Sequence, residues 1–108
     1  MAKKAKFDKN QKAPKWMVGD LNAGPGETVI WDGTGFNSEF VVWFPSDRNP
    51  LAKSNEVFSI DGVAQADLKQ AGGIIRKGER FPYCILLTDG VNKDVVVGPH
   101  SPPEMIID

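Results

Sequence analysis

The chain has 108 residues, of which 41% are hydrophobic and 25% are charged, with one cysteine and one histidine. This length supports one hydrophobic core but not two, and the ordinary globular composition excludes disorder throughout the chain. No apolar run approaches the roughly 20 residues that cross a bilayer, and no hydrophobic segment follows the N-terminal lysines as in a secretory signal. We therefore expect a cytoplasmic protein without a membrane partner, and the lone Cys84 agrees with a reducing compartment.

The net charge of -1 conceals a basic N-terminal segment. Residues 1–15 carry six lysines against one aspartate, whereas residues 16–108 carry seven basic and thirteen acidic residues. Because few apolar side chains precede Trp16, burial there should not offset the entropy of ordering, which predicts a flexible arm at 1–15 and one domain at 16–108. The arm either binds an acidic protein surface or nucleic acid, or it is a solubilising end, which we favour because it has no arginine and only Phe7 for stacking. Its lysines are Lys3, Lys4, Lys6, Lys9, Lys12 and Lys15.

From Trp16 onward, short runs rich in Val, Ile, Phe and Trp alternate with turn-forming residues, a pattern that predicts an all-β domain. In chain order the predicted strands are Trp16–Val18, Thr28–Trp31, Glu39–Phe44, Glu56–Ile60, Arg80–Leu87, Asp94–Val97 and Met105–Ile107. About seven short strands predict a two-sheet β-sandwich. Val63–Gln70 is expected to form one or two helical turns over one end of it.

Alternation along these strands separates a core face from an outer face. The predicted core residues are Val29, Trp31, Phe40, Val42, Phe44, Phe81, Tyr83, Ile85 and Leu87. The opposite faces also carry apolar residues, namely Ile30, Val41, Trp43, Cys84, Leu86 and Val96. Either loops, the N-terminal arm or the Val63–Gln70 segment cover these residues, or they form an interface with a subunit or partner. Cys84 is expected to be an inert core thiol.

Three segments carry a resemblance to a known family. They are Gly26-Glu27-Thr28-Val29-Ile30-Trp31, Phe36-Asn37-Ser38-Glu39-Phe40-Val41-Val42 and Lys77-Gly78-Glu79-Arg80-Phe81-Pro82-Tyr83. Their order resembles the cupredoxin family, which implies a Greek-key sandwich. The resemblance carries over no copper ligand, because Asn37 or Ser38 stands where the family's first histidine would be, and Cys84 directly follows Tyr83. A type 1 copper site takes two imidazoles and a thiolate, so one histidine cannot complete it, and we predict no cofactor.

No motif of catalytic strength is present, since Cys84 and His100 are separated by a predicted hairpin. We therefore predict that the protein is not an enzyme but an interaction or assembly module that presents an apolar surface to another copy of itself or to a protein partner. The interface candidates are Trp43, Val41, Ile30, Leu86 and Val96. One alternative is a copper-binding protein that uses His100 with Met105, Met17 or carboxylates. The other is binding of an acidic partner or, less favoured, nucleic acid through the basic arm.

Overall fold

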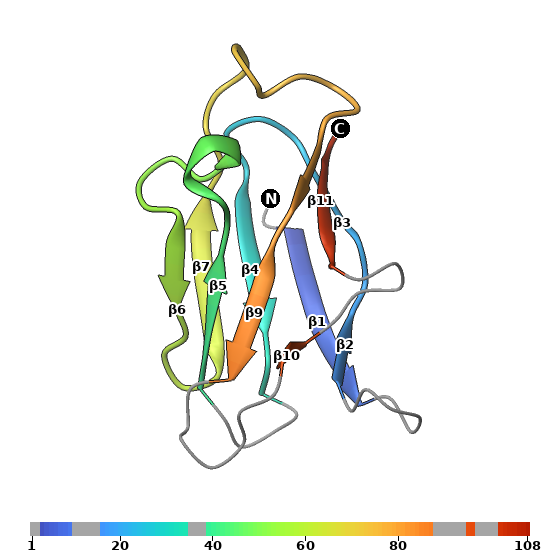
Figure 1. The fold of residues 1–108 in the computed structure, drawn as a ribbon, viewed down its shortest axis with the longest axis vertical. Helices are drawn as coiled ribbons and strands as arrows, with labels where there is room; N and C mark the ends of the chain where they lie inside the picture. The colour runs from blue at the N-terminus through green and yellow to red at the C-terminus, as the bar shows by residue number, and fades with distance from the viewer. Residues whose placement is uncertain (1–2, 10–15, 35–38, 88–94, 97–101) are drawn as a thin grey trace.

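The structure is a computed structural model that describes residues 3–9, 16–34, 39–87, 95–96 and 102–108. These residues form strands and a single short 3-10 helix, with no α-helix in the described ranges (Figure 1). The elements are β1 (Lys3–Lys9), β2 (Trp16–Val18), β3 (Leu21–Ala23), β4 (Thr28–Asp32), β5 (Phe40–Trp43), η1 (Ser46–Arg48), β6 (Glu56–Phe58), β7 (Val63–Asp67), β8 (Arg80–Pro82), β9 (Cys84–Leu87), β10 (Val95–Val96) and β11 (Glu104–Ile107). The predicted all-β class is confirmed. None of the helical structure in these ranges is long and apolar enough to cross a membrane.

The strands form three sheets, where the sequence predicted two. Their orders are β2-β1-β4-β7, β10-β9-β5-β6 and β3-β11-β8. The first two face each other, and the third lies beside them at the upper right of Figure 1. The third sheet exists because the predicted strand Arg80–Leu87 is interrupted at Tyr83, whose amide donates to the carbonyl of Pro103 at 3.0 Å. As a result β8 pairs with β11, whereas β9 pairs with β5 and β10.

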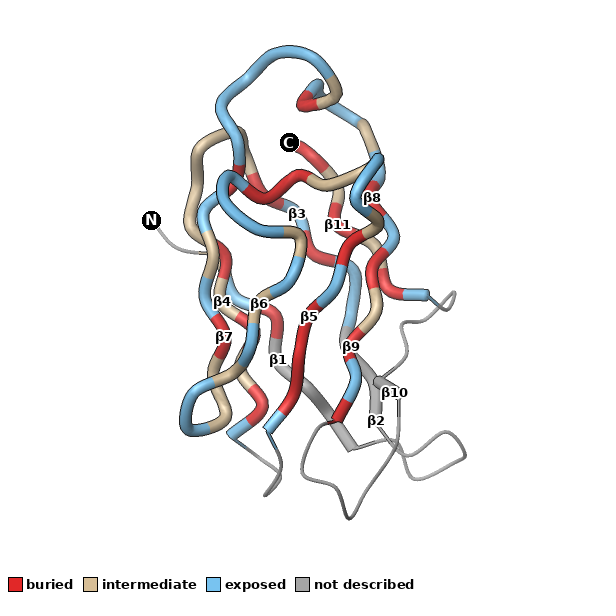
Figure 2. The backbone as a smooth tube through the Cα atoms, turned by 60° about the vertical axis from the view of Figure 1, so that its left-hand side comes forward, coloured by how far each residue is buried: buried red, intermediate tan, exposed pale blue. Residues whose placement is uncertain are grey.

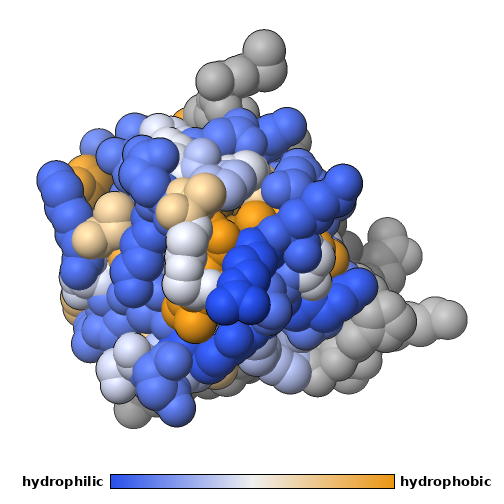
Figure 3. Space-filling view, turned by 90° about the horizontal axis from the view of Figure 1, so that it is seen from above, coloured by the Kyte–Doolittle hydropathy of each residue, from blue (hydrophilic) through white to orange (hydrophobic). Residues whose placement is uncertain are grey.

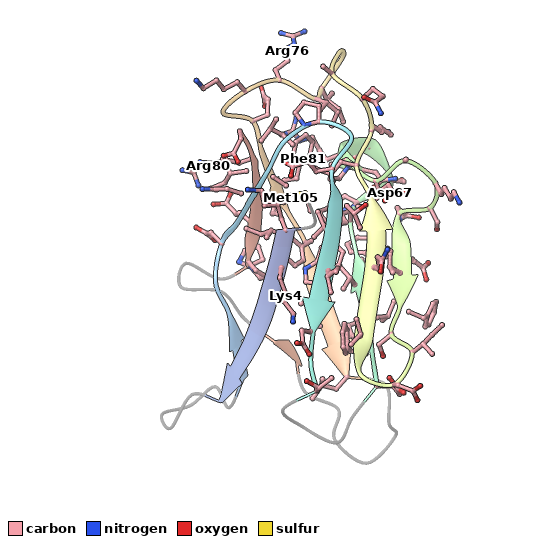
Figure 4. All side chains as sticks on the ribbon, turned by 180° about the vertical axis from the view of Figure 1, so that it is seen from behind. Lys4, Asp67, Arg76, Arg80, Phe81 and Met105 are labelled. Atoms are coloured by element: carbon pink, nitrogen blue, oxygen red, sulfur yellow. The ribbon has the colours of Figure 1, made fainter. Side chains whose placement is uncertain are left out.

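The N-terminal lysine-rich segment is not a flexible arm over Lys3–Lys9, so that prediction is wrong there. These residues form β1, which pairs in parallel with β4 and antiparallel with β2. Alternation places Ala5 in the core at 6% exposed, whereas Lys4 points outward and its Nζ lies 3.0 Å from Asp32 Oδ2 (Figure 4). The backbone hydrogen bonds to β2 and β4, together with this ion pair, stabilise a segment that has few apolar side chains to bury. Residues 10–15, with Lys12 and Lys15, lie outside the described residues.

The predicted helical turns at Val63–Gln70 are also wrong, because Val63–Asp67 is the strand β7, antiparallel to β4. A two-residue turn sets its direction. Ile60 and Val63 exchange backbone hydrogen bonds of 2.8 and 3.1 Å around Asp61 and Gly62. Both turn residues have positive φ, 53° and 81°, which is the geometry that an Asp-Gly hairpin turn supplies. The chain therefore leaves the turn extended, and Ala64 is buried on the core side.

The core lies between the facing sheets, and every residue that alternation assigned to it is buried. Figure 2 shows buried residues repeating along the strands. At its centre Tyr83 packs against Trp31 and Phe44, with ring centroids 5.8 and 5.0 Å apart. At its upper end the guanidinium of Arg48 lies 4.5 Å from the centroid of the buried Phe81 ring. The leucine, isoleucine and methionine side chains that complete the core include Leu21, Leu51, Leu68, Ile75, Met105 and Ile107.

The carboxylate of Asp32 joins β1 to the turn that follows β4, and it should contribute a measurable acid-sensitive stability. Hydrogen bonds from the Thr34 amide and hydroxyl, together with Lys4, lower the pKa of Asp32 from 3.8 to about 2. Because the folded pKa lies below the unfolded one, this stabilisation is present above pH 3.8 and is lost as the pH falls toward 2.

We expect Asp32→Asn to lower the free energy of unfolding at neutral pH by about 1 kcal/mol, allowing for solvent screening at the exposed Lys4. The difference from wild type should shrink on acidification to about pH 2.5, as measured by urea unfolding at both pH values. Asp108→Asn, at an exposed carboxylate, is the control. A difference of the same size at both pH values would contradict this assignment.

Candidate functional site

The outer surface of the sheet β10-β9-β5-β6 carries an apolar row across three neighbouring strands. Val41 on β5 pairs with both Phe58 on β6 and Leu86 on β9, so the three side chains lie side by side on one face. Phe58 is 62% exposed and Leu86 43%, and between them Val41 is only 8% exposed. The two flanking side chains therefore shield Val41 and are themselves left in solvent.

A second row of the same face contains Trp43. It pairs with Glu56 on one side and Cys84 on the other, and its side chain is 38% exposed. A hollow of about 140 Å³ opens beside it. The hollow is lined by Trp43, Pro45, Pro82, Tyr83, Cys84 and Pro102. We call Val41, Trp43, Phe58, Cys84 and Leu86 the outer face.

The interface candidates from the sequence do not all meet on this surface. Trp43, Val41 and Leu86 lie together, but Ile30 lies on β4 between Lys4 and Gln65, on the outside of the other sheet. Val96 pairs with Ile85, and its side chain is outside the described part of the structure. The sequence could not assign Ile30 to one sheet or the other, because alternation gives a side chain's direction but not the partner strand.

The structure adds Phe58 to the outer face and changes the place of Cys84. The period-2 pattern of Glu56 and Phe58 indicated that they share a face, but only the pairing with β5 shows which face it is. The sequence predicted a core thiol at Cys84, but Cys84 is half-buried beside the hollow. Its position follows from Tyr83, whose ring is buried and therefore directs the next residue outward.

The copper alternative finds no geometric support in the described residues. His100 and the side chain of Met17 lie outside them. Met105 is fully buried in β11, where it pairs with Leu21 and Phe81. No group of three or more His, Cys, Asp or Glu residues that could hold a metal ion occurs in the ranges the structure describes.

Two other parts of the surface are open. A cleft of about 360 Å³ lies where the edge strands β6 and β7 meet, lined by Leu51, Lys53, Ser54, Glu56, Val57, Phe58, Gln65, Ala66 and Asp67. The end that carries the loop before β8 is mainly hydrophilic at its rim, with hydrophobic atoms recessed between charged side chains (Figure 3). Arg76 points away from the body there (Figure 4). The exposed apolar side chains therefore concentrate on and beside β6, β5 and β9.

The wall between the hollow and the core contains an unusual polar group. Burial raises the pKa of Tyr83 to about 12; the nearby Trp31 indole N–H lowers it somewhat and Asp20 raises it. Neither Tyr83 Oη nor Trp31 Nε1 completes a well-formed hydrogen bond within the described residues. A buried hydroxyl without a full partner contributes less to stability than its ring does.

No protein-family model matches the chain, and no curated protein is significantly similar to it. The resemblance to cupredoxins consequently rests on the three sequence segments alone. What the molecule does has to be inferred from the outer face and the strands that build it.

Tyr83 gives a test of the packing behind the hollow, since it is the only tyrosine of the chain. We expect Tyr83→Phe to leave the free energy of unfolding at neutral pH unchanged or raised by up to about 1 kcal/mol, because it removes a buried hydroxyl that has no well-formed partner among the described residues. The folded pKa of about 12 lies above the unfolded value of 10.0. The wild type should therefore lose stability as the pH rises from 10 toward 12, and the variant should lose less.

Absorbance of tyrosinate, followed against pH in folded and urea-unfolded protein, measures both pKa values directly. Circular dichroism at each pH monitors the fold. A folded tyrosine that titrates near 10 would show that the Tyr83 hydroxyl is in contact with water.

Proposed function

We propose that this protein is a non-catalytic self-association module whose docking surface is the outer face. The observation that carries the proposal is the continuous apolar surface on β6, β5 and β9, with Phe58, Leu86 and Trp43 all exposed. The solvent-facing side of an antiparallel sheet normally carries polar residues. Contiguous exposed apolar patches on small proteins mark interaction sites. Tryptophan and phenylalanine are also the residues enriched at such contacts.

The geometry of the outer face suits sheet-on-sheet packing with a second copy. Its side chains stand on neighbouring strands, so little conformational entropy is lost when they are covered. Two such faces pack about 10 Å apart with interdigitating side chains. The hollow beside Trp43 is apolar and large enough to accept a side chain of the partner, and Trp43 is placed as the central anchor.

The proposal includes a cupredoxin-like Greek-key sandwich without a type 1 copper site. In support, the described residues of the segments that carry the resemblance lie on β4, β5 and β8 and directly beside these strands. Tyr83, between β8 and β9, is buried in the core, whereas Cys84, the first residue of β9, is half-buried beside the hollow. The thiol is thus directed to the outer surface, where a docking role uses its apolar character.

Trp43→Ala should weaken self-association at least about tenfold, because truncation of a central aromatic anchor typically removes 2 kcal/mol or more of binding free energy. The variant should keep its fold, since Trp43 is partly exposed and its neighbour Phe44 supplies the core contact. Sedimentation equilibrium over a range of protein concentrations measures the association, and thermal unfolding by circular dichroism checks the fold.

Ile30→Ala is the matched control, an apolar truncation on the outside of the opposite sheet. It should leave association unchanged. If Trp43→Ala and wild type have the same mass distribution at every concentration, the outer face is not the docking surface.

A further inference from the structure

The free edge of β6 presents the amide and carbonyl of Phe58, for which the described residues supply no partner. The Phe44 amide donates to the Asn55 carbonyl at 2.9 Å, and the Ser59 amide donates to the Phe40 carbonyl at 2.8 Å. Residues 55, 57 and 59 therefore direct their backbone groups toward β5. By alternation, Glu56 and Phe58 direct their backbone groups away from β5, toward the free edge of the sheet. The Glu56 amide donates to Ser54 Oγ at 3.2 Å, but the Phe58 amide and carbonyl have no partner among the described residues.

The neighbouring edge strand β7 differs in this respect. The Asp67 carbonyl accepts a hydrogen bond from the Ala52 amide at 2.9 Å, and Val63 exchanges two bonds with Ile60. Both ends of β7 are therefore covered by the chain itself, whereas β6 is open along the cleft it shares with β7. Proteins commonly protect an edge strand by short length, charged side chains, proline or a bulge; the three-residue β6 carries one charge, Glu56, but no lysine or proline.

We propose that two copies of this chain pair antiparallel through β6, about a two-fold axis at Val57. Each Phe58 would exchange hydrogen bonds with the partner's Glu56, whose amide would give up its bond to Ser54 Oγ, and the two four-stranded sheets would become one sheet of eight strands. The available groups select this register. Ile60 already uses both its amide and its carbonyl within the turn, so a shift toward it would lose one of the two exchanged pairs.

The charges at the two ends of the strand agree with this pairing. Lys53 and Asp61 stand four residues before and four residues after Val57, so the two-fold axis brings each Lys53 toward the partner's Asp61. Both residues are exposed, and neither takes part in any of the ion pairs found among the described residues. The carboxylate of Glu39 lies at the Asp61 end, where it accepts the Asp61 and Gly62 amides at 3.2 and 3.0 Å, and adds to the negative charge that meets Lys53. Glu56 faces the partner's Phe58, not the partner's Glu56, so no like charges are opposed.

The edge contact uses the backbone of Phe58, whereas the outer face uses its side chain, so measurements on the backbone amide distinguish the two. The first measurement is amide hydrogen exchange by NMR on the wild-type protein at low and high concentration. The Phe58 amide should be protected only at high concentration, whereas the Val57 amide, which faces β5, should be protected at both. Concentration-independent exchange at Phe58 would overturn the proposal.

Two substitutions at Phe58 isolate the contribution of its backbone amide, which points to the free edge of β6. Phe58→Ala and Phe58→Pro both remove the aromatic ring, but only Phe58→Pro removes the N–H, and proline is tolerated in an edge strand when that N–H faces solvent. We expect dimerisation through the edge to be about tenfold weaker in Phe58→Pro than in Phe58→Ala, since two symmetric hydrogen bonds are lost. Equal association of the two variants would overturn the edge pairing.

Charge reversal provides a variant that leaves the strand intact. Lys53→Glu should weaken edge dimerisation several-fold at low salt, because each introduced Glu would face the partner's Asp61. Lys69→Glu, at another exposed lysine away from β6, should have no effect. Equal weakening by both would show a general effect of net charge and would overturn the register.

The proposed function and the edge pairing fail in different ways. If Trp43→Ala alone abolishes all association, the outer face stands and the edge pairing is wrong. If Trp43→Ala still dimerises and the Phe58 amide remains protected at high concentration, the edge pairing stands independently of the outer face.

Discussion

The contact among the rings of Trp31, Phe44 and Tyr83 is the interaction on which the arrangement of the sheets depends. Trp31 belongs to β4, Phe44 follows β5, and Tyr83 stands between β8 and β9, so the three rings connect all three sheets. Tilted and edge-to-face aromatic contacts of this kind combine large buried area with a defined geometry. Movement of one sheet would separate its ring from the rings that the other two sheets contribute.

The same cluster determines what the molecule shows to solvent. Phe44 and Tyr83 each have an immediate neighbour that alternation turns outward, Trp43 and Cys84, and these two lie side by side on paired strands. The apolar hollow is thus the outer side of the packing at Tyr83. A substitution that reorients the core rings would be expected to change the shape of the docking surface as well.

Sequence alternation predicted the inward and outward sides of β4, β5 and β8–β9 correctly, because a strand has a side-chain period of two whatever its partners are. It failed at β1, where a lysine-rich segment lies next to β4 and the stabilising contact is with Asp32, distant in sequence. It failed at β7 as well, because the small residues Ala64 and Ala66 suit a helix locally and are extended here by pairing with β4. Membership of the outer face was predictable only in part, since Ile30 and Trp43 have similar local patterns but belong to different sheets.

The two parallel pairings have a consequence for how this fold is reached. β3 pairs with β11, so Leu21 meets Met105 across 84 residues of chain, and β1 pairs in the same sense with β4. Contacts between such distant segments are slow to form, because much of the chain must be closed into a loop first. During translation β3 would wait for its partner until residue 107 has been made. Throughout that interval the edge of β3 that β11 later pairs with stays open, which favours misassembly.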